Sequence, residues 1–406
     1  PYAGGQVARG GRIGMLGNRD MLDTPFSTSQ YTAKLMDDQQ AQTIGDVLVN
    51  DPSVRNSYAR GAGREEFSIR GLILFNYDVS YNGLYGMSPR NAASLIGVER
   101  VEVLRGPNAL LNGMAPSGSV GGSINLMPKR AALEPLNRVT LSYADDRQLG
   151  AHADLSRRLG EDKQWGVRLN AAKRSGDTQV NGASERVDAL ALGVDYLGER
   201  VRVEADFNYQ DRVTHARSSL LFPPPAGIAI PAAPDNKSNI QPHWSYWDAK
   251  ERAAMVRAEL DVAPGLLAYG AVGAMQYDFD SLQTTSLLRN AQGTLAVRPY
   301  RLDEYVDTQT IEAGLRSKFE TGVLAHEFVF SATGYAQDNG SLRQNGTISA
   351  SDLYTPSNLP LPSIALTGSI PRTAETRMRG LAVADTVSSP DRRIQLTLGA
   401  RHQQVR

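Results

Sequence analysis

Residues Val201 to Gln210 read VRVEADFNYQ and alternate without a break between apolar and polar side chains. Successive side chains of a β-strand point to opposite faces, so this segment has one apolar face and one polar face. Similar segments recur from about residue 137 to the end of the sequence, joined by alternating short and long connections. This combination predicts a transmembrane β-barrel with a polar lumen.

Composition agrees with that prediction and excludes several other classes of protein. The chain has 406 residues with 43 Lys and Arg against 43 Asp and Glu, so nothing favours a nucleic-acid partner. A mean hydropathy of −0.34 does not exclude a membrane, because a barrel meets lipid with only every second residue. No apolar run approaches the roughly 20 residues of a membrane helix. Without cysteine, neither disulfides nor thiolate metal sites can form.

Eleven strands account for the second part of the chain. We place them at 137–145, 148–159, 164–174, 186–197, 200–212, 249–263, 265–279, 305–320, 323–337, 376–387 and 392–406. The longer connections are expected at 175–185, 213–248, 280–304 and 338–375. Outer-membrane barrels have short periplasmic turns, long external loops and an even strand number, so we expect further strands beyond residue 406. A soluble β-sandwich with long loops is the alternative.

Residues 1–135 are glycine-rich and mix short strand and helix signals, which predicts an α+β domain. Residues 136–406 predict the wall of the barrel. Helices are expected to start at Thr43, with Asp46 completing a capping box, and at Ser88-Pro89. We also expect strands over Val98–Leu104 and Ser123–Met127, and between them a helical turn opened by Gly106-Pro107 and closed by Gly113. A globular domain of this size before a barrel is expected to plug its lumen, which suits a barrel of about 22 strands, about half of them present here.

Several stretches of this first domain resemble a known family. They are Asp23-Thr-Pro-Phe26, 46–54 (DVLVNDPSV), Phe67-Ser-Ile-Arg-Gly71, 96–107 (IGVERVEVLRGP) and 112–125 (NGMAPSGSVGGSIN). Together they closely resemble the plug of TonB-dependent siderophore receptors, especially the ferrichrome-receptor-like branch. The resemblance covers the whole first domain, and the strand pattern continues it.

The resemblance implies an outer-membrane receptor that imports a ferric siderophore across a Gram-negative-type envelope. TonB, with its inner-membrane energising complex, would displace the plug by pulling near its N-terminus. The TonB box is not recognisable before Leu16 and is expected to precede this sequence. The partners implied are TonB, the siderophore and outer-membrane lipid around a monomer. No cofactor or protein metal ligand is implied, because the chelator already ligates the transported iron.

Two sets of plug residues acquire expected roles from the resemblance. Arg70 and Arg105 would latch the plug to glutamates of the barrel wall beyond residue 406, with Glu99 and Glu102 as local candidates; ordinary surface arginines are the alternative. The apical loops 57–64 and 74–90 would contact the ligand. The residues chosen there are Arg60, Arg64, Tyr81, Tyr85 and Met87, although the tyrosines could equally pack the loop against the wall.

Some wall residues attract attention by their chemistry. Trp247 is expected in the aromatic girdle at the membrane interface, although the Trp244/Trp247 pair could instead close over ligand. Arg168, Arg202 and Arg257 should face the lumen, where they either attract an anionic chelate or line the hydrated contact with the plug; we favour the second role.

No catalytic constellation is found, so we predict that the protein is not an enzyme. The five histidines are scattered, and neither HExxH nor GxSxG occurs. Three other functions remain open: a receptor for haem, cobalamin or a sugar, a passive porin, and an outer-membrane hydrolase. A plug-like domain argues against a porin, and a hydrolase would need a constellation beyond residue 406.

Overall fold

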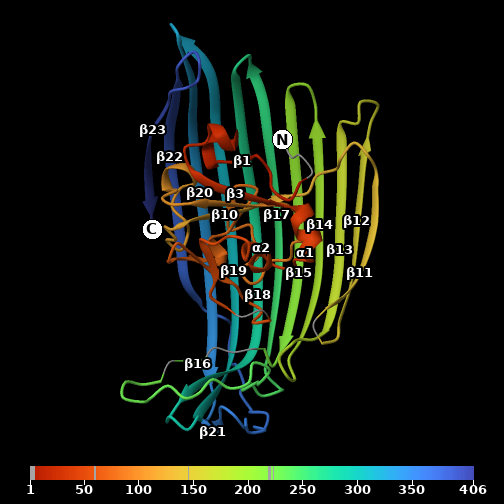
Figure 1. Ribbon diagram of the computed structural model, residues 1–406, viewed down its shortest axis with the longest axis vertical. Coiled ribbons are helices and arrows are strands. Elements are labelled where there is room, and N and C mark those ends of the chain that lie inside the picture. Colours follow the sequence, from red (N-terminus) through yellow and green to blue (C-terminus); the bar gives the residue numbers. More distant parts are fainter. Residues whose placement is uncertain (1–4, 59–60, 145, 218–220, 223) are drawn as a thin grey trace.

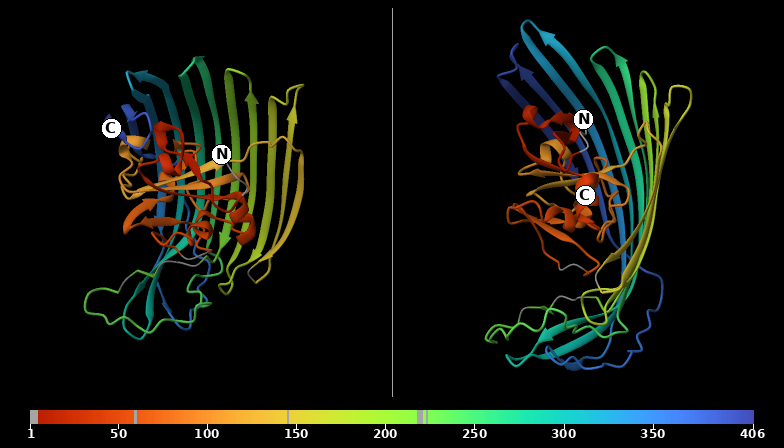
Figure 2. Two further views of the ribbon diagram at one scale, coloured as in Figure 1. Left: turned by 45° about the horizontal axis from the view of Figure 1, so that its top comes forward. Right: turned by 45° about the vertical axis from the view of Figure 1, so that its right-hand side comes forward.

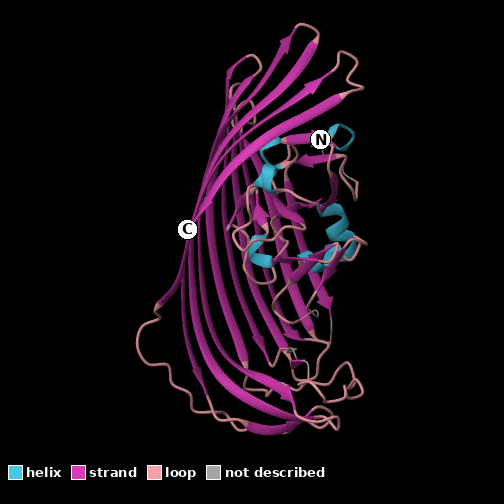
Figure 3. Ribbon diagram, turned by 90° about the vertical axis from the view of Figure 1, so that its left-hand side faces the viewer, coloured by secondary structure: helices cyan, strands magenta, loops and turns pink. Residues whose placement is uncertain are grey.

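A computed structural model describes residues 5–58, 61–144, 146–217, 221–222 and 224–406. It shows a tall, curved antiparallel sheet, which we call the wall, with a smaller mixed unit, the plug, against its concave face (Figures 1 and 3). The connections that contain β16 and β21 gather at one end of the wall, which we call the long-loop end (Figure 1). Turned views show the plug lying across the middle of the wall, clear of these connections (Figure 2).

Among the described residues the wall is a thirteen-stranded sheet whose main path follows the chain from β11 to β23. Its strands are β11 (Leu136–Ala144), β12 (Gln148–Leu159), β13 (Trp165–Asp177), β14 (Ser184–Leu197), β15 (Val201–His215), β17 (Tyr246–Ala263), β18 (Leu266–Leu288), β19 (Thr294–Thr321), β20 (Leu324–Asn345), β22 (Arg372–Ser388) and β23 (Gln395–Val405). The short strands β16 (Leu221–Phe222) and β21 (Ser349–Asp352) pair with β18 and β19 off that path. All eleven predicted strands are therefore confirmed.

The wall has a polar face toward the plug and an apolar face on its opposite side. On β15 the polar Asp206 and Gln210 are 5% and 3% exposed, whereas the apolar Phe207 between them is 38% exposed. The same holds at the first strand, where Val139 and Leu141 are 71% and 80% exposed. Polar side chains face the plug and apolar ones face away, which is the arrangement of a barrel that meets lipid outside.

The predicted loop at 280–304 is wrong, because the strands continue through most of it. β18 runs to Leu288 and β19 starts at Thr294, so most of the predicted 280–304 connection is a long hairpin. The outward side chains of β18 change from Val272 and Ala274 to Gln276 and Asp278. Beyond that border the strands no longer need an apolar face, and the alternation used to find them disappears.

Among the described residues the plug contains three sheets of its own, three short α-helices and three 3-10 helices. Its elements are β1 (Gly10–Arg12), η1 (Gly14–Leu16), β2 (Asn18–Asp20), η2 (Met21–Asp23), β3 (Ser27–Thr32), α1 (Ala33–Gln39), α2 (Ile44–Leu48), β4 (Val54–Asn56), β5 (Glu66–Ile69), β6 (Leu72–Phe75), η3 (Asn76–Asp78), β7 (Ser80–Tyr81), β8 (Leu84–Tyr85), β9 (Val98–Arg105), α3 (Ala109–Asn112) and β10 (Gly122–Pro128). In the described residues the larger sheet has the order β3-β9-β10-β7-β8, the smaller has β4-β5-β6, and β1 and β2 form a separate hairpin.

Local sequence signals explain several plug elements. The capping box at Thr43 and Asp46 is present and starts α2, and Gly113 follows α3 as its C-cap with φ +80°. The strands predicted at 98–104 and 123–127 are confirmed as β9 and β10. The helix predicted at Ser88-Pro89 is wrong: this segment is irregular, and the side chain of Asn76 donates to the carbonyl of Pro89 at 2.9 Å.

Two apolar clusters join plug and wall. The larger is the plug core around Phe67, Ile69 and Ile124, which extends onto Met255 and Met275 of the wall. The smaller packs the η1 region of the plug against β20 and β22. Among the described residues, no helix combines the length and apolar character that crossing a membrane requires.

Candidate functional site

An open cavity of about 520 Å³ lies at the long-loop end, between the plug loops nearest that end and the inner face of β17 to β20. The plug contributes Arg64, Tyr77, Arg90 and Asn91 to its lining. The wall and the 213–248 connection contribute Arg217, Trp247, Tyr277, Phe279, Tyr300, Glu304 and Arg343, among others. We call this space the loop-end cavity. Its mixture of aromatic rings and fixed charges suits a rigid, partly apolar and oxygen-rich ligand.

Arginines in this cavity rest on aromatic rings. The guanidinium of Arg217 lies 3.5 Å from the ring centroid of Trp247, and that of Arg343 lies 3.8 Å from Tyr300. Arg90 lies 4.7 Å from the ring centroid of Tyr77. Stacking of this kind fixes the plane of a guanidinium but leaves its N–H edge free to bind oxygen atoms.

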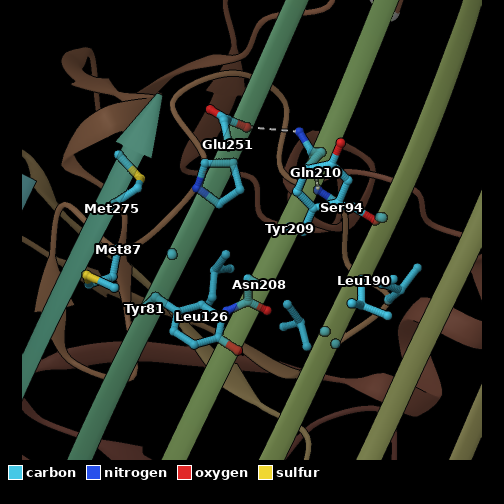
Figure 4. Close-up of a pocket in the computed structure, with 17 residues that line it drawn as sticks. Tyr81, Met87, Ser94, Leu126, Leu190, Asn208, Tyr209, Gln210, Glu251 and Met275 are labelled. Atoms are coloured by element: carbon cyan, nitrogen blue, oxygen red, sulfur yellow. Dashed lines mark hydrogen bonds between the residues drawn. The ribbon is translucent and has the colours of Figure 1, made fainter. Parts of the chain in front are cut away.

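Below the cavity, the plug is fastened to the wall by hydrogen bonds to its backbone. The backbone N–H of Arg90 donates to Glu251 at 2.6 Å, and that of Ser94 donates to Gln210 at 2.8 Å. Gln210 also donates to Glu251 at 3.2 Å, as Figure 4 shows. Asn91 donates to the hydroxyl of Tyr277 at 3.2 Å. The irregular 88–94 segment therefore uses wall side chains where a helix would use its own carbonyls.

Further from the loops, buried ion pairs join the plug to the wall. Glu312 of β19 pairs with Arg12 of the plug at 3.4 Å and with Arg257 of β17 at 3.2 Å. Arg257 also donates to the carbonyl of Asn82 at 2.8 Å. Arg19 pairs with Glu327 at 2.7 Å. These contacts hold the β1–β2 hairpin to the wall near the plug's N-terminus.

A second set of pairs lies where the plug leads into the first wall strand. Arg130 binds Asp206 at 2.7 Å and Glu204 at 3.1 Å, and Lys129 binds Asp154 at 3.3 Å. The lumen-facing prediction is confirmed for three arginines. Arg168 and Arg257 donate to plug carbonyls, and Arg202 pairs with Glu259, which also binds Arg316 beneath the plug.

The predicted ligand residues are distributed over different places. Arg64 lines the loop-end cavity and stacks 5.0 Å above Tyr58, but Arg60 lies outside the described residues. Tyr81 and Met87 are buried and line an internal space between plug and wall, beside Asn208 and Met275 (Figure 4). Tyr85 lines another internal space, next to Arg401. A ligand role for these residues stays a prediction, and only Arg64 of the four described residues lies at the open cavity.

Close packing explains the position of Met87. Gly273 of β18 approaches it so closely that a Cβ there would stand 2.7 Å from the Met87 sulfur. Gly86, with φ +73°, lets the chain pass Thr308 at a distance that a side chain would not permit. The 81–87 segment is therefore seated against the wall.

The predicted latch residues have partners inside the plug. The guanidinium of Arg105 pairs with Asp51 and donates to the hydroxyls of Ser53 and Ser29, both at 2.7 Å. Glu102 binds Arg100 at 2.9 Å and accepts from the backbone of Arg12. Glu99 is half-buried, and desolvation raises its pKa. Arg70 is exposed, with φ +52°. Their latch role stays a prediction. In the described chain the plug residues Arg12, Arg19, Lys129 and Arg130 pair with wall carboxylates, and Asp37 pairs with Arg138 of the wall.

Sequence reasoning missed Arg217, Arg343 and Tyr300 and misplaced Trp247. Trp247 is not in the membrane girdle: it is 9% exposed, faces the lumen and packs edge-on against Phe279 with centroids 5.1 Å apart. The outward aromatic pair is Trp165 and Tyr196, near the short turns. Strand parity could have corrected this, since Trp247 shares a face with Ala249 and Glu251.

Glu65 is one of several acidic residues that are buried inside the plug. Glu65 accepts from the backbone of Gly45 at 2.7 Å. Burial raises the pKa of its carboxyl to about 7, although hydrogen bonds from Thr43 and Gly45 act in the opposite direction. The carboxyl of Glu65 therefore releases its proton at a higher pH than an ordinary glutamic acid does.

Residues 20–121 match the family described as the TonB-dependent Receptor Plug Domain. The ferrichrome receptor of Yersinia enterocolitica is 37% identical over 413 residues, which cover 100% of this chain and 54% of that protein. The ferric preacinetobactin receptor of Acinetobacter baumannii superposes with a TM-score of 0.94 at 36% identity, over 100% of this chain and 61% of that one. The ferripyoverdine receptor of Pseudomonas aeruginosa, at 20% identity and a TM-score of 0.84, shares the fold. The chain thus spans about half the length of the curated ferrichrome receptor that it matches.

Proposed function

This chain belongs to the TonB-dependent receptors, and from that premise we propose that the protein imports a ferric siderophore across the outer membrane. The observation that carries the proposal is the loop-end cavity, where fixed arginines and aromatic rings of wall and plug face the same space. Its similarity to receptors named for ferrichrome and ferric preacinetobactin supports a ferric chelate as the ligand.

The domain division follows from the same premise. We propose that residues 1–135 act as the plug and that residues 136–406 supply strands of the surrounding wall. The plug occupies the concave face of the wall across its middle, which supports a role in blocking free diffusion (Figure 3). TonB is the proposed source of force, acting near the N-terminus, where Arg12 and Arg19 fasten the β1–β2 hairpin.

The predicted site residues have two different roles in this proposal, contact with the ligand and positioning of the loops. Arg64 is proposed to contact the ligand, because it lines the cavity. Tyr81, Tyr85 and Met87 are proposed to position the loops that contact it, since they pack between plug and wall.

The test is uptake of radiolabelled iron by cells in which the full-length protein is the only siderophore receptor. A panel of ferric chelates would be offered with and without functional TonB. TonB-dependent uptake of at least one chelate is expected. Uptake that survives loss of TonB would indicate a porin, and uptake of none would direct the search to haem, cobalamin and sugars.

A further inference from the structure

The loop-end cavity has an excess of positive charge that its own residues do not neutralise. Its described lining contains four arginines, Arg64, Arg90, Arg217 and Arg343, but Glu304 as its one carboxylate. Arg64 pairs with Glu66 at 3.4 Å, outside the lining. For the other three arginines, the described residues provide no carboxylate within ion-pair distance. At the deeper interface, by contrast, Arg168, Arg257 and Arg316 contact the plug and are paired with acids. Arg401 is an exception there: it donates to the carbonyl of Leu110 and to Thr333, and the described residues give it no ion pair.

The three arginines without acidic partners are nevertheless held in place. Arg90 donates to Gln337 at 3.4 Å as well as lying over Tyr77, and Arg343 donates to Asn345 at 3.2 Å while stacked on Tyr300. Neutral partners and ring faces fix the orientation of a guanidinium without cancelling its charge. A cation held in this way in a partly desolvated cavity favours an anion more strongly than it would in water.

Arg217 is the most constrained of them. It donates to the carbonyl of Ala62 in the plug at 2.7 Å and to Gln283 of β18 at 3.2 Å, and its flat face rests on Trp247. Burial lowers the pKa of Arg217 to about 10, so the group stays charged at neutral pH. Its position links the plug, the wall and the cavity through a single side chain.

We propose that this cavity selects ferric chelates that carry net negative charge, with Arg217 as the principal anchor for an oxygen edge of the chelate. The proposal rests on the function proposed above and deepens it by naming the charge class of the ligand. Three hydroxamates neutralise ferric iron, whereas three catecholates leave the complex negative. The cavity therefore favours a catecholate-type or otherwise anionic chelate over a neutral hydroxamate chelate. The N–H groups of Arg217 that do not donate to Ala62 and Gln283 supply charge-assisted hydrogen bonds to the chelate, and the two existing bonds fix their direction.

The experiment compares two probes on the purified full-length protein: a ferric tris-catecholate, which is anionic, and a neutral ferric tris-hydroxamate of similar size. Binding would be followed by quenching of tryptophan fluorescence, because Trp247 lies directly beneath Arg217. The variants are Arg217→Gln and Arg343→Gln. The matched control is Arg289→Gln, which removes the same charge from an exposed turn at the same end of the wall.

The wild type is expected to bind the anionic probe at least about tenfold more tightly than the neutral one, and less tightly as salt is raised. Arg217→Gln should weaken binding of the anionic probe about tenfold and change binding of the neutral probe less than twofold. Arg289→Gln should change neither. If Arg217→Gln does not fold, Arg343→Gln still tests the charge preference, with a smaller loss expected.

Two failures are distinguishable. Equal or better binding of the neutral probe by the wild type would overturn the charge preference while leaving a siderophore receptor intact. Failure to bind or import any ferric chelate would instead overturn the proposed function itself. A loss of affinity in Arg289→Gln equal to that in Arg217→Gln would show a diffuse surface effect and would also overturn the assignment of Arg217.

Discussion

Glu312→Gln should loosen the β1–β2 hairpin from the wall without opening a cavity, because glutamine has nearly the same shape as glutamate. Glu312 is the carboxylate that pairs with both Arg12 and Arg257, and the three side chains are only 8%, 10% and 4% exposed. Removing one member of a buried pair costs about 3–5 kcal/mol, since the remaining charge stays desolvated and unpaired. Glutamine keeps an oxygen acceptor, so the lower end, about 3 kcal/mol, is the appropriate magnitude.

Amide hydrogen exchange on the full-length protein in lipid nanodiscs measures this loss directly. A fall of about 3 kcal/mol in opening free energy should speed exchange of the β1–β2 amides roughly 100-fold, while amides of wall strand β13 remain unchanged. The matched control is Glu375→Gln, whose pair with Arg377 at 2.7 Å has side chains 38% and 46% exposed. Exposed pairs contribute about 0–1 kcal/mol. Hairpin exchange that changes no more in Glu312→Gln than in the control would refute the assignment of Glu312 as an anchor.

Other expected outcomes follow from burial and close packing. Because burial raises the pKa of Glu65 to about 7 from 4.5, the folded plug retains a proton that the unfolded chain loses. This group's contribution to stability should therefore fall by up to about 3 kcal/mol as pH rises from 4.5 to 7, and urea titrations of Glu65→Gln should lack that fall. Gly273→Val should unseat Met87 at a cost of about 1–3 kcal/mol. Gly270→Ala on the same strand, where a Cβ meets nothing nearer than 3.6 Å, should be tolerated, and protease sensitivity of residues 81–94 would compare the two.

The sequence was sufficient to predict every strand of the wall where the strand has one apolar and one polar face. The errors there are confined to the ends of the strands. Lipid on one side and a polar plug on the other force a strict two-residue period, visible in Val201–Gln210. Once the outward side chains become polar at Gln276, both faces meet water or other loops, and the period vanishes although the strand continues to Leu288. Alternation between apolar and polar residues arises only where one face of a strand meets lipid and the other meets a polar environment. It therefore cannot reveal strands that have polar surroundings on both faces.

Features of the plug that depend on neighbouring residues could be predicted from the sequence, whereas those that depend on distant contacts could not. Capping and glycine signals located α2 and α3, because these depend on a few neighbouring residues. The irregular 88–94 segment could not be predicted, because wall side chains such as Gln210 and Glu251 satisfy its backbone from more than a hundred residues away. The stack of Arg217 on Trp247 is equally invisible in sequence, since it joins a loop residue to the start of a strand across a long connection.

The polar character of the plug–wall interface has a mechanical consequence for the proposed transport. A seal made of apolar surface would cost about 25 cal/mol for each Å² exposed when plug and wall separate. The attraction within a buried ion pair is largely offset by its desolvation, so a pair that separates into water loses little net free energy. Of the seven wall residues in the two shared apolar clusters, four are alanines, which bury little area. The buried ion pairs therefore hold the plug to the wall, but their separation costs little free energy once water can reach the charged groups. A force applied at the β1–β2 hairpin then needs only to break the first pairs.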